Sequence, residues 1–118
     1  MNIKLKYINL DYLQSSINNN LFIIKILDVF AGELPKIEKR MKDALLTSNY
    51  TELSEIAHKA KSSVAILGMD SEKEAMRNLE LDSQNNIKQE TYRQRVDDFL
   101  QNCKKAIEEI EIIRKAFS

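Results

Sequence analysis

The stretch LFIIKILDVFAGELPKIEKRMKDALL, from Leu21 to Leu46, repeats apolar side chains every three or four residues. That spacing gathers them on one face of an α-helix. The face comprises Ile23, Ile26, Leu27, Phe30, Leu34, Ile37, Met41, Ala44 and Leu45. Gly32 and Pro35 interrupt it, so we expect one long helix with a bend there. An apolar face of this length must pack against other helices.

Three more amphipathic segments follow this helix. We expect them at Asn49 to Leu67, Ser71 to Ser83, and Tyr92 through Ser118. Two places have the pattern of a capping box: Asn49 followed by Glu52, and Ser71 followed by Glu74. In each, the first side chain can cap the helix and the carboxylate can accept a hydrogen bond from the backbone N–H of the capping residue. Gly68 is typical of a helix end. The last segment places charged side chains on every face except its apolar stripe.

The first twenty residues give weaker signals. We expect an extended lead-in over Met1 to Tyr7 and a short helix over Leu10 to Leu13 that ends before Ser15 and Ser16. The asparagine run at 18–20 supplies an N-cap for the long helix. The predicted fold is all-α: residues 1–118 form one domain, an antiparallel up-and-down four-helix bundle with a short extra N-terminal helix.

The composition argues against several functional classes. The 18 basic and 18 acidic side chains balance, which does not favour a nucleic-acid or membrane-surface binder. The longest apolar run, Leu21 to Ile24, is too short for a membrane span or a signal peptide, so we expect a cytoplasmic protein. The single cysteine, Cys103, excludes an internal disulfide, and we interpret it as a core residue. Glu55 and His58 have the spacing of a di-iron ligand pair, but a second histidine is lacking, so we expect no metal site.

The one histidine occupies an unusual helix surface. The buried face of the third helix is expected to comprise Leu53, Ile56, Ala57, Ala60, Val64 and Leu67, and His58 lies nearly opposite. Its neighbours one turn away include Ser54 and Ser62. Long Glu, Lys and Arg side chains are more usual on a bare helix surface. The small ones here would let a partner approach the imidazole closely.

An exposed imidazole is largely neutral at pH 7, so one ring nitrogen carries a free lone pair and is nucleophilic. Lys61, one turn later, could lie beside any group that this nitrogen acquires. A phosphoryl group carries about two negative charges, which Lys61 would partly balance. Lys59 is about 100° from His58 around the helix, and we assign it to the solvated surface.

These residues resemble the signature of the histidine phosphotransfer (HPt) domains of multistep phosphorelays. The similar residues are Ala57, His58, Lys59, Ala60, Lys61, Ser62 and Ser63, followed by Leu67, Gly68 and Met69. Phe30, Pro35, Asn49 and the pair Leu79 and Glu80 also fall where such domains have equivalents. Ser62 departs from the pattern, because the family usually has glycine at that position.

The resemblance implies a phosphorelay intermediate that is not itself an enzyme. His58 would accept a phosphoryl group on Nε2 from the aspartyl phosphate of a receiver domain and pass it to another receiver. Lys61 would offset the phosphoryl charge, Glu80 would hydrogen-bond the other ring nitrogen, and Ser62 would keep the surface open. The expected partners are response-regulator receiver domains and a hybrid sensor kinase. The chain would be a monomer without a cofactor of its own, and magnesium would belong to the receiver.

Two alternatives remain at the level of the sequence. His58 taken alone could be an ordinary surface histidine, and the domain could be a helical interaction module that transfers no phosphoryl group. Phe22 and Val29 lie about 100° off the main apolar stripe. They would either pack against the short first helix or extend a docking patch beside His58.

Overall fold

The computed structural model describes residues 3–117, and this part of the chain is helical without β-strands. The elements are α1 (Asp11–Ser16), α2 (Asn20–Leu46), α3 (Tyr50–Ile66), α4 (Asp70–Gln84), a 3₁₀ turn η1 (Gln89–Thr91) and α5 (Tyr92–Phe117). The predicted all-α class is confirmed. The expected lead-in starts at Met1 and the expected last helix runs through Ser118, and both of these residues lie outside the described part of the chain.

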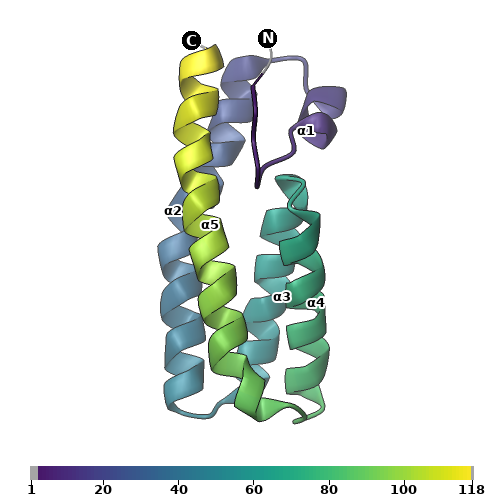
Figure 1. Ribbon diagram of the computed structural model, residues 1–118, viewed down its shortest axis with the longest axis vertical. Coiled ribbons are helices and arrows are strands. Elements are labelled where there is room, and N and C mark those ends of the chain that lie inside the picture. Colours follow the sequence, from purple (N-terminus) through teal and green to yellow (C-terminus); the bar gives the residue numbers. More distant parts are fainter. Residues whose placement is uncertain (1–2, 118) are drawn as a thin grey trace.

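The four longer helices lie side by side along the long axis of the molecule (Figure 1). Helices α2 and α5 have 27 and 26 residues, whereas α3 and α4 have 17 and 15. At 1.5 Å per residue, α3 and α4 are therefore about 15 Å shorter than their neighbours. The N-terminal segment and α1 fill the space at the end of the molecule that the shorter helices leave (Figure 1).

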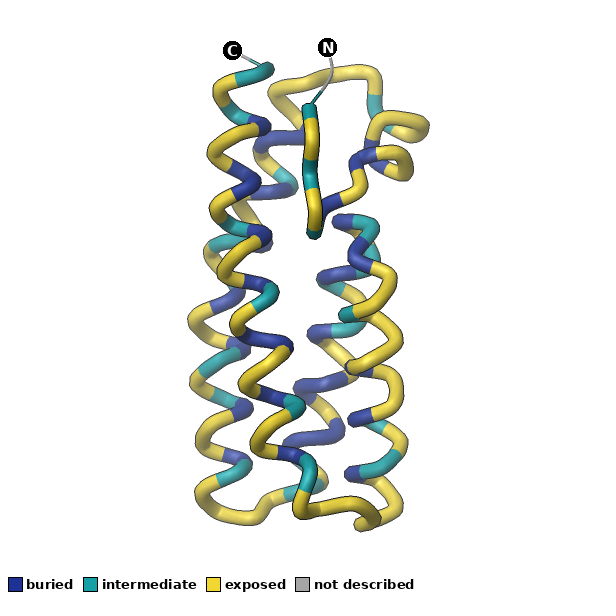
Figure 2. Tube along the Cα trace, in the orientation of Figure 1, coloured by how far each residue is buried: buried dark blue, intermediate teal, exposed yellow. Residues whose placement is uncertain are grey.

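The core follows the predicted apolar stripes, and the buried positions of each long helix face inward (Figure 2). On α2 the buried members are Ile23, Leu27, Phe30, Leu34, Ile37, Met41 and Ala44, while Ile26 and Leu45 are half-buried. The helix continues without interruption through Gly32 and Pro35. Cys103 is fully buried, as expected, and burial raises the pKa of its thiol to about 12.

The start of α3 matches the prediction in part. The Asn49 side chain accepts a hydrogen bond from the Glu52 backbone N–H at 3.1 Å, so the cap is confirmed. The expected second bond, from the Asn49 backbone N–H to the Glu52 carboxylate, is absent. That carboxylate instead pairs with Arg40 of α2 at 2.6 Å, and the Asn49 N–H donates to the Ala44 carbonyl at 2.9 Å. A guanidinium on a neighbouring helix offers the carboxylate a stronger, charge-assisted partner than a backbone amide.

The bounds of two other helices differ from the prediction. Helix α4 runs from Asp70 to Gln84 rather than from Ser71 to Ser83, and its N-cap residue, the buried Met69, makes no side-chain capping bond. Helix α1 includes Ser15 and Ser16, which we expected to follow it. The Ser15 hydroxyl donates to the Tyr12 carbonyl at 2.8 Å, so it bonds within the helix. Upstream of α2, Asn19 accepts from the Phe22 N–H and supplies the predicted cap.

The extended lead-in is anchored by one buried carboxylate. Glu109 of α5 is only 8% exposed and accepts hydrogen bonds from the backbone N–H groups of Lys6, Tyr7 and Ile8 at 2.6, 3.0 and 2.8 Å. The sequence predicts that the charged residues of α5 lie on its solvated faces, and for Glu109 this prediction is wrong. The lead-in covers this carboxylate and supplies it with three hydrogen-bond donors. The carboxylate in turn gives these backbone N–H groups the acceptor that they would otherwise lack.

The same segment fixes the end of α3. The Asn9 N–H donates to the Leu67 carbonyl at 2.9 Å. Gly68 has φ +67°, and a Cβ there would lie 2.4 Å from the Asn9 carbonyl oxygen, so both the conformation and the space require glycine.

Over residues 3–117, none of the helices combines the length and the apolar character needed to cross a membrane.

Candidate functional site

His58 lies in the middle of α3, on the side away from the core. Its side chain is 61% exposed, whereas Ala57 beside it and Ala60 two residues on are fully buried. The predicted placement opposite the buried face is therefore confirmed. One expected neighbour lies elsewhere: Ser54 is 5% exposed and faces α4, so it is not part of the open surface around the ring.

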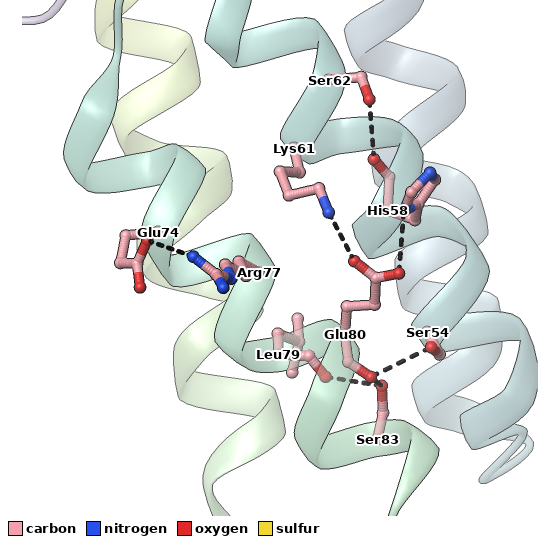
Figure 3. Close-up of polar contacts among 9 residues, drawn as sticks. All are labelled: Ser54, His58, Lys61, Ser62, Glu74, Arg77, Leu79, Glu80 and Ser83. Atoms are coloured by element: carbon pink, nitrogen blue, oxygen red, sulfur yellow. Dashed lines mark hydrogen bonds and ion pairs between the residues drawn. The ribbon is translucent and has the colours of Figure 1, made fainter.

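Glu80 of α4 joins the histidine to Lys61. The His58 Nδ1 lies 2.9 Å from Glu80 Oε2, and the Lys61 Nζ lies 3.0 Å from Glu80 Oε1 (Figure 3). The Glu80 side chain is 15% exposed and that of Lys61 is 24% exposed. The three residues form a continuous hydrogen-bonded group on the surface shared by α3 and α4. The contact between Glu80 and His58 that the resemblance implied is present.

The charge of Glu80 decides which ring nitrogen carries the proton. Partial burial alone would raise the pKa of this carboxyl, but hydrogen bonds from Lys61 and His58 outweigh burial and leave the pKa below its usual value. At neutral pH Glu80 is therefore a carboxylate and can only accept hydrogen bonds. Nδ1 must then carry the hydrogen, and in the neutral ring Nε2 keeps the lone pair. Figure 3 shows this second nitrogen pointing away from Glu80.

Lys61 contacts the group from the side of α3 nearest α4. Its ammonium is bound to the Glu80 carboxylate, which also binds the His58 imidazole. The expected role beside an acquired phosphoryl group stays a prediction. The hydrogen bond from Lys61 also lowers the pKa of the Glu80 carboxyl, against the effect of partial burial, which is a second way for it to act on the imidazole. Lys59 points elsewhere and pairs with Glu33 of α2 at 3.3 Å.

Ser62 is exposed one turn after His58. Its hydroxyl lies 3.4 Å from the His58 carbonyl oxygen, on its own helix (Figure 3). Ser63 does the same with the Lys59 carbonyl at 3.2 Å. Both side chains are short and bonded back to the helix, so neither extends over the imidazole. The surface on this side of the ring is open, as the sequence predicts.

Two serines, Ser54 and Ser83, hold the backbone of Glu80, a role that the sequence does not predict for either. The Ser54 hydroxyl donates across the helix pair to the Glu80 carbonyl at 3.1 Å, and the Ser83 hydroxyl lies 3.2 Å from the same oxygen (Figure 3). Ser83 also donates to the Leu79 carbonyl at 2.6 Å, within α4. The signal for Ser54 was its position at the edge of the buried face of α3, where a polar side chain requires a partner.

Two apolar side chains of α2 lie outside the core. Phe22 and Val29 are 50% and 64% exposed, and both interpretations of this pair, packing against the first helix and a docking patch, stay predictions. Val29 lines a shallow, mainly apolar groove between α2 and α3 together with Ile26, Phe30, Glu33, Ser63, Ile66 and Leu67. Of the serines that follow His58, Ser63 lines this groove.

The described part of the chain does not form a metal site. Among residues 3–117, no three His, Cys, Asp or Glu side chains come together in a way that could hold a metal ion. Comparison of the chain with models of protein families, with curated proteins and with solved structures gave no match. The features that bear on function are therefore the geometry of His58, Glu80 and Lys61 and the resemblance of the motif.

Proposed function

We propose that this protein is a phosphorelay intermediate of the histidine phosphotransfer type. His58 accepts a phosphoryl group from the aspartyl phosphate of a receiver domain and passes it to another receiver. The fold that accompanies this function is the antiparallel up-and-down four-helix bundle, with α1 as the short additional helix. The chain binds no cofactor for this step, because the receiver brings the magnesium and most of the catalytic groups.

The observation that carries the proposal is the state of the imidazole. Its Nδ1 is bound to a carboxylate and its Nε2 faces away from that contact, on a ring that is 61% exposed. A nucleophile presented in this way needs no rearrangement of its own helix before it meets an electrophile. An ordinary surface histidine lacks a mostly buried carboxylate that is itself held by a lysine at 3.0 Å.

The transfer step balances without a further reactant. The Nε2 lone pair attacks the phosphorus of the aspartyl phosphate and forms the N–P bond. The bond between phosphorus and the aspartate oxygen breaks, and the aspartate leaves as a carboxylate. The proton of the imidazole stays on Nδ1, where Glu80 accepts its hydrogen bond and stabilises the positive charge that the ring gains. The reverse sequence returns the group to a receiver.

The partner surface includes the open side of α3. Ser62 and Ser63 leave room for the receiver, and the apolar groove that ends at Val29 and Ile66 supplies area that a receiver can cover. Each molecule then works as a monomer with one receiver at a time. We place this exchange in the cytoplasm.

The same groove favours one alternative, a helical interaction module without phosphotransfer. Its exposed apolar side chains, Val29 and Ile66, would suit non-covalent binding equally well. The two accounts differ at His58, which the interaction module does not need as a nucleophile.

Phosphoryl transfer from receivers tests the proposal. The protein and its His58→Gln variant are incubated with a panel of receiver domains from the same genome, each carrying radiolabelled phosphate on its aspartate. The proposal predicts label on the parent protein that is lost in acid and retained in base, and no label on the variant. Absence of transfer from every receiver, with binding retained, would support the interaction module instead.

A further inference from the structure

Ser54 is the one buried serine of α3, and its hydroxyl is used differently from those of its neighbours. Serine hydroxyls inside helices usually bond to a carbonyl one turn back in the same helix. Ser62, Ser63 and Ser83 all do this, with their i−4 carbonyls. The Ser54 hydroxyl instead crosses to α4 and donates to the Glu80 carbonyl at 3.1 Å.

This bond joins the two helices at the level of the site. Ser54 lies one turn before His58 on α3, and its acceptor belongs to the residue whose carboxylate holds His58 Nδ1 (Figure 3). Glu80 is thus bound at its carbonyl by one residue of α3 and at its carboxylate by two others. A shift of α4 along α3 would therefore have two effects at once: it would break the Ser54 bond and move the Glu80 carboxylate away from the imidazole.

We infer that Ser54 is a positioning residue, which sets α4 against α3 so that the Glu80 carboxylate holds the proton of His58 on Nδ1. The consequence for phosphotransfer rests on the proposed function. The effect on the imidazole itself does not, because the tautomer is a property of the free protein. Neutral imidazole has two tautomers of similar energy, so a modest loss of alignment changes their ratio.

The ring nitrogens report this directly, because the chain has one histidine and its signals need no assignment. Nitrogen chemical shifts of ¹⁵N-labelled protein are recorded at about pH 9, to compare the two neutral tautomers of the ring. The parent is expected to show the Nδ1–H tautomer. Ser54→Ala should raise the ratio of Nε2–H to Nδ1–H roughly fivefold, the effect expected from losing one hydrogen bond of ordinary strength. Ser54→Cys, which keeps a weaker donor of similar size, should give an intermediate ratio.

Two controls separate positioning from a general effect of losing a hydroxyl. Ser63→Ala removes a hydroxyl that bonds only within α3, and it should leave the ring signals unchanged. Ser83→Ala leaves the Ser54 bond intact and should have a smaller effect than Ser54→Ala. Parent-like ring signals in both Ser54→Ala and Ser54→Cys would overturn the inference, and so would a parent protein that already shows mixed tautomers. A shifted tautomer in Ser54→Ala without phosphoryl transfer to the parent would leave the inference standing and remove the proposed function.

Discussion

Glu80→Gln removes the negative charge on which His58 and Lys61 converge while keeping the size of the side chain. The bond to Lys61 joins side chains that are 24% and 15% exposed, and we expect it to contribute about 1 kcal/mol to the free energy of unfolding. The bond to His58, whose side chain is 61% exposed, should add only a few tenths of that amount. For a domain of this size the sum lowers the melting temperature at pH 7 by about 5 °C.

The pH dependence of this difference follows from the pKa of Glu80. The folded-state pKa lies below its usual value, so ionised Glu80 stabilises the folded state. That contribution is complete above the unfolded value, at about pH 5 and higher, and is lost as the pH falls through the folded pKa. Glutamine does not titrate. The difference in melting temperature between the parent and Glu80→Gln should therefore be fully present at about pH 5 and shrink towards pH 3.

Thermal unfolding followed by circular dichroism across this pH range provides the measurement. Glu74→Gln is the matched control, because Glu74 lies on the same helix, is 59% exposed and reaches its partner Arg77 only at 4.0 Å (Figure 3). It should change the melting temperature by less than about 1 °C at any pH. Equal melting temperatures for the parent and Glu80→Gln at pH 7 would refute the reasoning. A difference that persists undiminished at pH 3 would also refute it.

Three further changes have defined outcomes. Lys61→Ala should slow transfer several-fold without preventing receiver binding, since one partly exposed ammonium is worth about 1 kcal/mol; equal rates and equal phosphohistidine lifetimes would remove Lys61 from the site. At Ser62, which is exposed beside His58, glycine and alanine should keep most of the transfer rate while glutamine and arginine lower it strongly; a rate that falls with glycine and alanine but not with glutamine would show that the hydroxyl matters rather than the space. The Glu109 carboxylate accepts from three backbone N–H groups, and in Glu109→Gln one of its two oxygens becomes an NH₂ group, which can only donate. Chemical denaturation should show a free energy of unfolding lower by about 2 kcal/mol, and an unchanged midpoint would mean that the lead-in does not depend on this anchor.

Helix spans could be predicted from the sequence because each apolar stripe is long and regular. The second helix was expected at Leu21 to Leu46 and is found at Asn20–Leu46. The start of α4 could not be predicted in the same way. Ser71 and Glu74 look like a cap in sequence, but the helix start is set by Met69, which is buried in the core. Local signals lose to tertiary packing when the competing side chain is large and apolar.

The candidate site was predictable only in part. The exposure of His58 follows from helical periodicity, since the core face of α3 is clear. Its contact with Glu80 joins residues 22 apart on two helices, and only the resemblance pointed to it. The bond from Ser54 was missed because a serine hydroxyl can use its own helix or a neighbouring one, and the choice depends on the distance between helices.

The central claim is that His58 Nε2 accepts the phosphoryl group, and locating that group on the protein tests it most directly. Protein labelled with ¹⁵N is phosphorylated by a receiver domain, and coupling between ³¹P and the ring nitrogens is measured by NMR. We expect coupling to Nε2 of the single histidine and none in His58→Gln. The melting temperature of this variant should stay within a few degrees of the parent, because the side chain is exposed. A phosphoryl group on Nδ1 or on another residue, or persistent phosphorylation of His58→Gln, would contradict the central claim.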